Sequence, residues 1–158
     1  MQVRIYLDAC AINRLTDDQR QARVLAEAEA VEQVLDLVTD GKVCWIASSA
    51  LRAELERNPN EAKRAVSLAL LPFASEFIEP NEAIFQRASA LAAEGLGSFD
   101  ALHLALAEQA QADCLLTTDD RFLALAARTR AHLLPSVLNP VDWWDRRSQW
   151  LLQPESTR

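Results

Sequence analysis

The chain has 158 residues, of which 50% are hydrophobic, three are glycine and six are proline. This length and composition suit one domain with its own core and argue against a disordered or fibrous chain. The apolar runs are much shorter than the roughly 20 residues that a membrane-spanning helix needs, and Arg4 and Asp8 interrupt what would be the apolar region of a signal peptide. We therefore expect a cytoplasmic protein with no membrane partner, formed by a single domain over residues 1–158 with a frayed tail over 151–158.

The charge of the chain limits how it can contact nucleic acid. A net charge of −7 and a pI of about 4.8 argue against a protein that holds nucleic acid mainly by electrostatic attraction. They do not exclude an enzyme that acts on nucleic acid through a metal cluster. Cys10, Cys44 and Cys114 are widely spaced and form no C-x-x-C pair. We expect these cysteines to be reduced thiols in the core rather than a disulfide or a zinc site.

Strand and helix patterns alternate from one end of the chain to the other. The apolar runs predict strands at residues 3–7, 43–47, 76–78, 114–117 and 135–138. Helical spacing predicts helices at residues 22–38, 48–57, 61–71, 81–94, 98–111 and 120–128, with a short last helix from Pro140. This alternation predicts an α/β fold with a parallel sheet of four to five strands. In the helix over 22–38 we expect the acids to form a solvated face, namely Glu27, Glu29, Glu32 and Asp36.

Four acids fall near the carboxyl ends of the predicted strands. Asp8 directly follows the first strand and Asp119 follows the fourth, while Glu54 lies in the helix after the second strand and Asp100 in the first turn of the helix that leads to the fourth. In open α/β sheets, sites form beyond these strand ends, where the strand order reverses. With the order 3-2-1-4-5, the first and fourth strands flank that point. We expect the four carboxylates to meet there, where they repel one another unless a cation joins them.

Each of these acids also has a structural explanation. Asp8 and Asp119 can cap the helices that follow them, and Asp100 carries a charge that favours a helix N-terminus. Glu54 can simply face solvent. Independent caps have no reason to converge on one place, so convergence separates the two interpretations.

A cluster of carboxylates suits metal-dependent hydrolysis of a phosphodiester. Hard cations such as Mg²⁺ and Mn²⁺ take oxygen ligands. One ion can activate or orient a water, and a second ion roughly 4 Å away can stabilise the leaving oxygen. We assign no separate histidine base, because His103 lies mid-helix and His132 near the last strand, where we expect packing or surface positions.

Several motifs resemble one family over nearly the whole chain. They are IYLDAC at residues 5–10, SALRAE at 49–54, SFDALHLA at 98–105, LTTDDRF at 116–122 and VLNPVDW at 137–143. In this order and spacing the chain resembles the PIN-domain family, in particular the VapC-like ribonuclease toxins of toxin–antitoxin pairs.

The resemblance implies a three-layer α/β/α fold and an Mg²⁺- or Mn²⁺-dependent ribonuclease. Its substrate would be RNA, its partner a cognate antitoxin, and self-association as a homodimer is also implied. Carried over by motif, the metal-binding acids would be Asp8, Glu54, Asp100 and Asp119. Thr117 would support the site or a bound water, and Asn13 is close enough in sequence to line the cleft. Asp120 is the uncertain position, because Asp119 fits the T-x-D-x-x-F pattern better.

Two other questions stay open at the level of sequence. A PIN-like scaffold could bind RNA or a protein partner without cutting, although a pure binder has no need of a costly carboxylate cluster. The tryptophans near the C-terminus could stack on bases or pack the last helix onto the sheet or another subunit, and we expect packing for Trp143, Trp144 and Trp150.

Overall fold

Five strands form one parallel sheet in the order β3-β2-β1-β4-β5, as predicted. The computed structural model describes residues 2–151. Its strands are β1 (Val3–Leu7), β2 (Val43–Ser48), β3 (Glu76–Ile78), β4 (Cys114–Leu116) and β5 (Ser136–Leu138). The order reverses between β1 and β4, which are hydrogen-bonded neighbours at the centre of the sheet.

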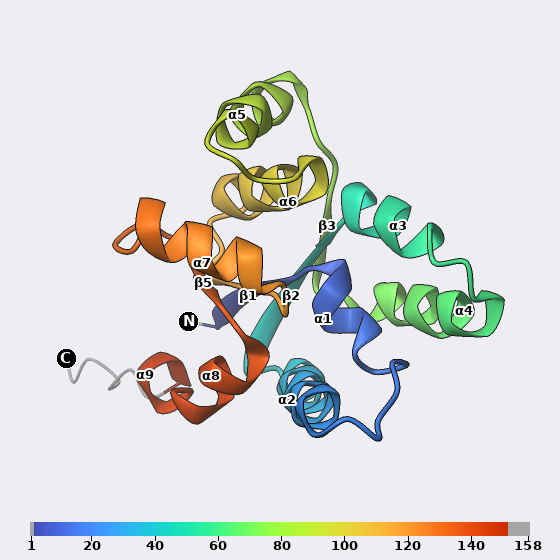
Figure 1. Ribbon diagram of the computed structural model, residues 1–158. Coiled ribbons are helices and arrows are strands. Elements are labelled where there is room, and N and C mark those ends of the chain that lie inside the picture. The colour runs from blue at the N-terminus through green and yellow to red at the C-terminus, as the bar shows by residue number, and fades with distance from the viewer. Residues whose placement is uncertain (1, 152–158) are drawn as a thin grey trace.

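Helices cover both faces of the sheet and give the predicted three layers (Figure 1). They are α1 (Ala9–Asn13), α2 (Ala22–Thr39), α3 (Ser49–Glu56), α4 (Glu61–Leu70), the 3₁₀ turn Leu71–Phe73, α5 (Glu82–Ala93), α6 (Ser98–Gln109), α7 (Asp120–Thr129), α8 (Pro140–Asp145) and α9 (Ser148–Leu151). Leu151 ends α9, and the rest of the expected tail lies outside the described residues. None of the helices within residues 2–151 combines the length and the apolar character needed to cross a bilayer.

Alternating side chains of the central strands divide the core between the two faces. Ile5 and Leu7 of β1 pack with Val31 and Val34 of α2 and with Trp143 of α8. Tyr6 points to the other face, where it packs with residues of α5, α6 and α7. This period of two is what a strand buried on both sides requires.

The tryptophans near the C-terminus pack as expected. Trp143 is fully buried in the core cluster on the face of the sheet that α2 covers, and Trp144 and Trp150 pack against the same cluster. These contacts attach α8 and α9 to the face that α2 also covers.

The prediction of a fully solvated acidic face on α2 is wrong for one residue. Glu29, Glu32 and Asp36 are exposed, but Glu27 is only 2% exposed. Its Oε1 accepts hydrogen bonds from Nε of Arg14 (3.0 Å) and Nε of Arg23 (3.3 Å). A buried carboxylate is tolerated when it is paired and hydrogen-bonded in this way.

Candidate active site

Asp8 stands at the carboxyl end of β1 and is 1% exposed. Its backbone N–H donates to the carbonyl of Leu116 (3.2 Å), which ties this position to the end of β4. One carboxylate oxygen, Oδ1, accepts from the backbone N–H of Ala11 (2.9 Å) and caps α1. The other, Oδ2, is buried and has no hydrogen-bond partner among the described residues. Asp8 is therefore a helix cap with one oxygen left over.

Burial raises the pKa of Asp8 to about 7, against the opposing effect of the nearby Thr117 hydroxyl. Thr117 follows β4 and is fully buried, and its Oγ1 accepts from the backbone N–H of Asp119 (3.2 Å). This threonine lies between the two acids that end the central strands.

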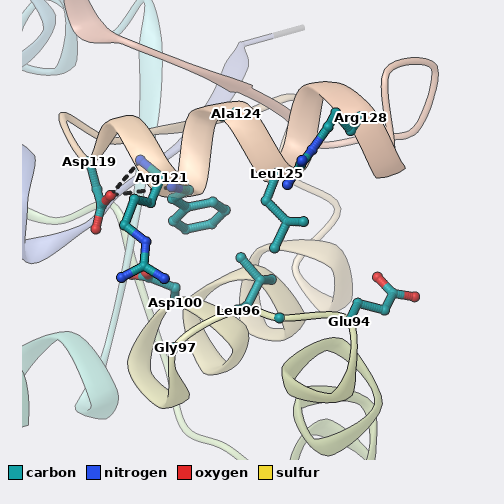
Figure 2. A pocket seen from close by; sticks show the side chains of 11 residues that line it. Glu94, Leu96, Gly97, Asp100, Asp119, Arg121, Ala124, Leu125 and Arg128 are labelled. Carbon is teal, nitrogen blue, oxygen red and sulfur yellow. Dashed lines mark hydrogen bonds between the residues drawn. The ribbon is translucent and has the colours of Figure 1, made fainter.

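Asp119 repeats the arrangement of Asp8 at the end of β4. Its Oδ1 caps α7 by accepting from the backbone N–H groups of Arg121 (2.9 Å) and Phe122 (3.2 Å), as Figure 2 shows. Within the described residues its Oδ2 makes no hydrogen bond. The sequence left cap and site acid as competing explanations, and the geometry allows both for the same side chain.

Asp100 comes to this edge from the first turn of α6. Burial is the main cause that raises its pKa, to about 6, and the negative charges of Asp119 and Glu54 raise it further. Asp100 and Asp119 also line the same pocket, which lies between α7 and the segment that joins α5 to α6 (Figure 2).

All four predicted acids affect the pKa of one thiol, that of Cys10. Burial raises the pKa of this thiol, and Asp8, Glu54, Asp100 and Asp119 each raise it further by their negative charge. Because such effects fall off with distance, each of the four carboxylates lies near enough to Cys10 to act on its thiol. The structure thus brings together four acids that are separated by as many as 111 positions in the chain.

Glu54 is held in place by a chain of hydrogen bonds that the sequence did not reveal, which starts at a part-buried contact with His103 and continues into the core. Its Oε1 lies 3.0 Å from Nε2 of His103, and Nδ1 of His103 lies 2.7 Å from the hydroxyl of Tyr6. That hydroxyl is in turn 2.6 Å from Oγ of Ser48, which accepts from the backbone N–H of Leu51 (3.0 Å).

One placement of protons satisfies every member of this chain. Ser48 donates to Tyr6, Tyr6 donates to Nδ1 of His103, and the ring donates from Nε2 to Glu54. His103 is fully buried, so it is a packed residue as expected and not a surface one. It also orients a site acid, a role for which its position in the helical motif gave no signal.

Two of the supporting residues have other partners. Asp120 is exposed at the start of α7, and its two oxygens accept from NH1 and NH2 of Arg23 at 2.8 Å each. Asn13 ends α1, and its Oδ1 accepts from Oγ of Ser67 on α4 (3.3 Å). These bonds give both residues structural roles.

The donor chemistry of the site fits a divalent hard cation. Its ligands would all be carboxylate oxygens, and a cation would compensate the buried Oδ2 of Asp8 and the repulsion that raises the pKa of Asp100. Within residues 2–151, however, no three His, Cys, Asp or Glu side chains come close enough to form a ready-made metal cage.

The fold and these acids define a class of α/β protein with a carboxylate cluster at the switch point of a parallel sheet. The model of the PIN domain family matches residues 5–128, and the chain belongs to this family. Among solved structures, the chain is similar to VapC20 of Mycobacterium tuberculosis, described as a sarcin-ricin loop cleaving toxin. The sequences are 13% identical, the TM-score is 0.58, and the match covers 83% of this chain and 97% of that one. No curated protein matches the sequence.

Proposed function

We propose that this protein is an endoribonuclease that hydrolyses phosphodiester bonds of RNA with Mg²⁺ or Mn²⁺. The observation that carries the proposal is the convergence of four carboxylates around Cys10, with the buried Oδ2 of Asp8 unpartnered among the described residues. Membership of the PIN family and the likeness to VapC20, a sarcin-ricin loop cleaving toxin, support a nuclease of the toxin type.

In this proposal Asp8, Glu54, Asp100 and Asp119 hold the metal. The bound ion would activate water and stabilise charge on the leaving oxygen. The chain's own part is to orient these carboxylates: the caps of α1 and α7 fix Asp8 and Asp119, and His103 fixes Glu54. Thr117 supports Asp8 and Asp119, the acids at the ends of β1 and β4. The hydrogen bonds of Asp120 and Asn13 favour structural roles for those two residues.

The biological setting that we infer is a toxin–antitoxin pair. The chain would act as one domain in the cytoplasm, with RNA as substrate and a cognate antitoxin as inhibitor, and it could form a homodimer. Membership of the PIN family and the likeness to VapC20, a sarcin-ricin loop cleaving toxin, support this setting.

The test is cleavage of structured RNAs with Mg²⁺, Mn²⁺ or EDTA. Asp8→Asn keeps the shape of the side chain and its Oδ1 cap but removes the charge, and Asp40→Asn, an exposed acid after α2, is the matched control. We expect cleavage by the unaltered protein and by Asp40→Asn with metal, and none in EDTA or by Asp8→Asn. Cleavage that persists in EDTA or in Asp8→Asn contradicts the metal mechanism.

A second candidate is a PIN scaffold that binds RNA or a protein partner without cutting. The lack of a ready-made three-ligand cage within residues 2–151 favours it. Retained RNA binding with no cleavage in either metal would support the scaffold and end the nuclease proposal.

A further inference from the structure

A pocket of about 790 Å³ opens directly beside Asp100 and Asp119 (Figure 2). Helix α7 forms one wall, and residues 95–97, which join α5 to α6, form the other. Its volume is within the roughly 300–1,000 Å³ typical of ligand sites. The pocket is therefore large enough to receive part of a substrate whose reacting bond lies at the acids.

The back of the pocket is apolar. Figure 2 shows Leu96 of the joining segment and Leu125 of α7 pointing toward one another, away from the carboxylates. Gly95 has a φ of +113°, a conformation that favours glycine, and a Cβ there would lie 3.6 Å from Leu125. The segment thus approaches α7 closely and leaves a surface of aliphatic side chains for a flat, weakly polar group.

Two arginines of α7 add positive charge along the same pocket. Arg121 and Arg128 are seven residues apart, so they share one face of the helix about 10 Å apart along its axis. Figure 2 shows the side chain of Arg121 extending toward Asp100, while Arg128 lies at the far end, across from Glu94. Among residues 2–151 neither arginine forms an ion pair, whereas Arg23 and Arg130 nearby are both paired. Their charge is available to a ligand.

We propose that this pocket is a subsite for one unpaired nucleotide of an RNA strand, adjoining the bond that is cut. The base lies against Leu96 and Leu125, and Arg121 and Arg128 contact phosphates on its two sides. Sequence recognition of RNA generally uses unpaired bases splayed out onto protein side chains, whereas bases in a duplex stay stacked. The subsite rests on the proposed function. Its two arginines place positive charge beside the acids Glu94, Asp100 and Asp119 that line the same pocket, where phosphates would otherwise be repelled.

The test is binding in EDTA, which is read without any cleavage. The probes are a short fluorescein-labelled single-stranded RNA and a duplex of the same sequence, measured by anisotropy over a series of salt concentrations. The variants are Arg128→Gln, Ala124→Trp to fill the pocket, and Arg146→Gln as a matched exposed arginine outside it. Thermal unfolding checks that each variant is folded.

We expect Arg128→Gln to bind the single strand about tenfold more weakly. Its plot of log affinity against log salt should also be shallower by about 0.7, the value for one lost phosphate contact on a single strand. Ala124→Trp should weaken single-strand binding without changing that slope, and Arg146→Gln should match the unaltered protein. Duplex binding should be the same in all variants.

Equal losses in Arg128→Gln and Arg146→Gln would overturn the subsite. So would single-strand affinity that is unchanged in both pocket variants, which would assign the pocket to another class of ligand such as a partner protein. Cleavage tested separately with Mn²⁺ distinguishes the two proposals. Intact cleavage without dependence on the pocket removes the subsite alone, and pocket-dependent binding without any cleavage removes the nuclease alone.

Discussion

Asp8 and Glu27 are two buried carboxylates with opposite surroundings. Asp8 is 1% exposed and Glu27 is 2% exposed. Both oxygens of Glu27 are satisfied, Oε1 by Arg14 and Arg23 and Oε2 by the side-chain amide of Asn139. Asp8 has one backbone N–H on Oδ1, no partner among the described residues for Oδ2, and other acids as neighbours.

The difference separates an acid with a structural role from the acid to which the proposed function assigns metal binding. Glu27 joins α2 to Arg14 after α1 and to Asn139, which caps α8, so its charge holds three segments together. The charge of Asp8 caps a helix and lies near the Thr117 hydroxyl, but it forms no ion pair among residues 2–151, and burial makes that charge costly. We infer that Glu27 contributes to stability, whereas Asp8 reduces stability for the sake of the site.

The largest expected effect is the loss of cleavage in Asp8→Asn, by about 1,000-fold or more, because a metal ligand contributes several kcal/mol to transition-state stabilisation. Unfolding in urea at pH 8 should show the variant to be as stable as the unaltered protein or more stable, since a buried charge is removed. A clear loss of stability in Asp8→Asn would contradict the comparison with Glu27.

Glu27→Gln should have the reverse pattern. We expect the free energy of unfolding to fall by about 1–3 kcal/mol, because Arg14 and Arg23 lose a charged acceptor, while the cleavage rate of the folded fraction changes little. Glu29→Gln, an exposed position on the same helix, is the control and should change stability by no more than about 0.5 kcal/mol. Loss of cleavage without loss of stability in Glu27→Gln would mean that Glu27 belongs to the site.

The pH dependence of the free energy of unfolding should show the cost of burying the charges of Asp8 and Asp100. The pKa values of Asp8 (about 7) and Asp100 (about 6) lie above the ordinary value of about 3.9, so between these values the folded state binds more protons than the unfolded state. Their contribution to stability is therefore present at about pH 4 and is lost as the pH rises toward 7. Urea unfolding across this range should show the decline, and Asp8→Asn should show less of it.

Divalent metal should reverse that decline at neutral pH. At a concentration 100-fold above its dissociation constant, an ion that binds only the folded state adds about 2.7 kcal/mol. Millimolar Mn²⁺ should raise the melting temperature of the unaltered protein, and EDTA should lower it again. An equal rise in Asp8→Asn would show that the ion binds elsewhere.

Tyr6→Phe tests Glu54, whose orientation depends on hydrogen bonds from neighbouring side chains. Loss of the hydroxyl leaves Nδ1 of His103 without its partner and loosens the ring that orients Glu54. We expect cleavage about tenfold slower through kcat, with KM nearly unchanged, because substrate contacts are not removed. A change in KM alone would indicate that the hydrogen-bond chain does not act through Glu54.

Asp120→Asn should have the smallest effect. This exposed residue pairs with Arg23 at the surface, and exposed pairs contribute about 0–1 kcal/mol. Cleavage should be nearly unchanged, whereas Asp119→Asn, one position earlier, should reduce it as strongly as Asp8→Asn. Equal and mild effects at both positions would show that neither completes the site.

The fold could be predicted from sequence because its signals are local. The short apolar runs and the helical spacing between them predicted the strands, the helices and a parallel sheet, whereas the three layers were implied by the resemblance to the PIN-domain family. The acids at strand ends could be placed at one edge because parallel strands all point the same way. Glu27 was also predictable in retrospect, since it lies three residues after Val24 and four before Val31, on the buried stripe of α2.

The remaining features depend on tertiary geometry. The bond between His103 and Glu54 joins α3 to α6 across 49 positions, and its existence depends on how the two helices lie over the sheet. The pocket beside Asp100 depends on how closely residues 95–97 approach α7. Neither leaves a periodic signal in the chain.

The two oxygens of Asp8 and of Asp119 have separate roles, and this has a consequence for how the protein can evolve. In each, one oxygen caps a helix and the other is left for chemistry. Replacement by asparagine exchanges one oxygen for an amide group and can leave the capping oxygen in place. In the proposed nuclease, one such substitution would remove a metal ligand without loss of the fold, so an inactive protein with the same surfaces is a single substitution away.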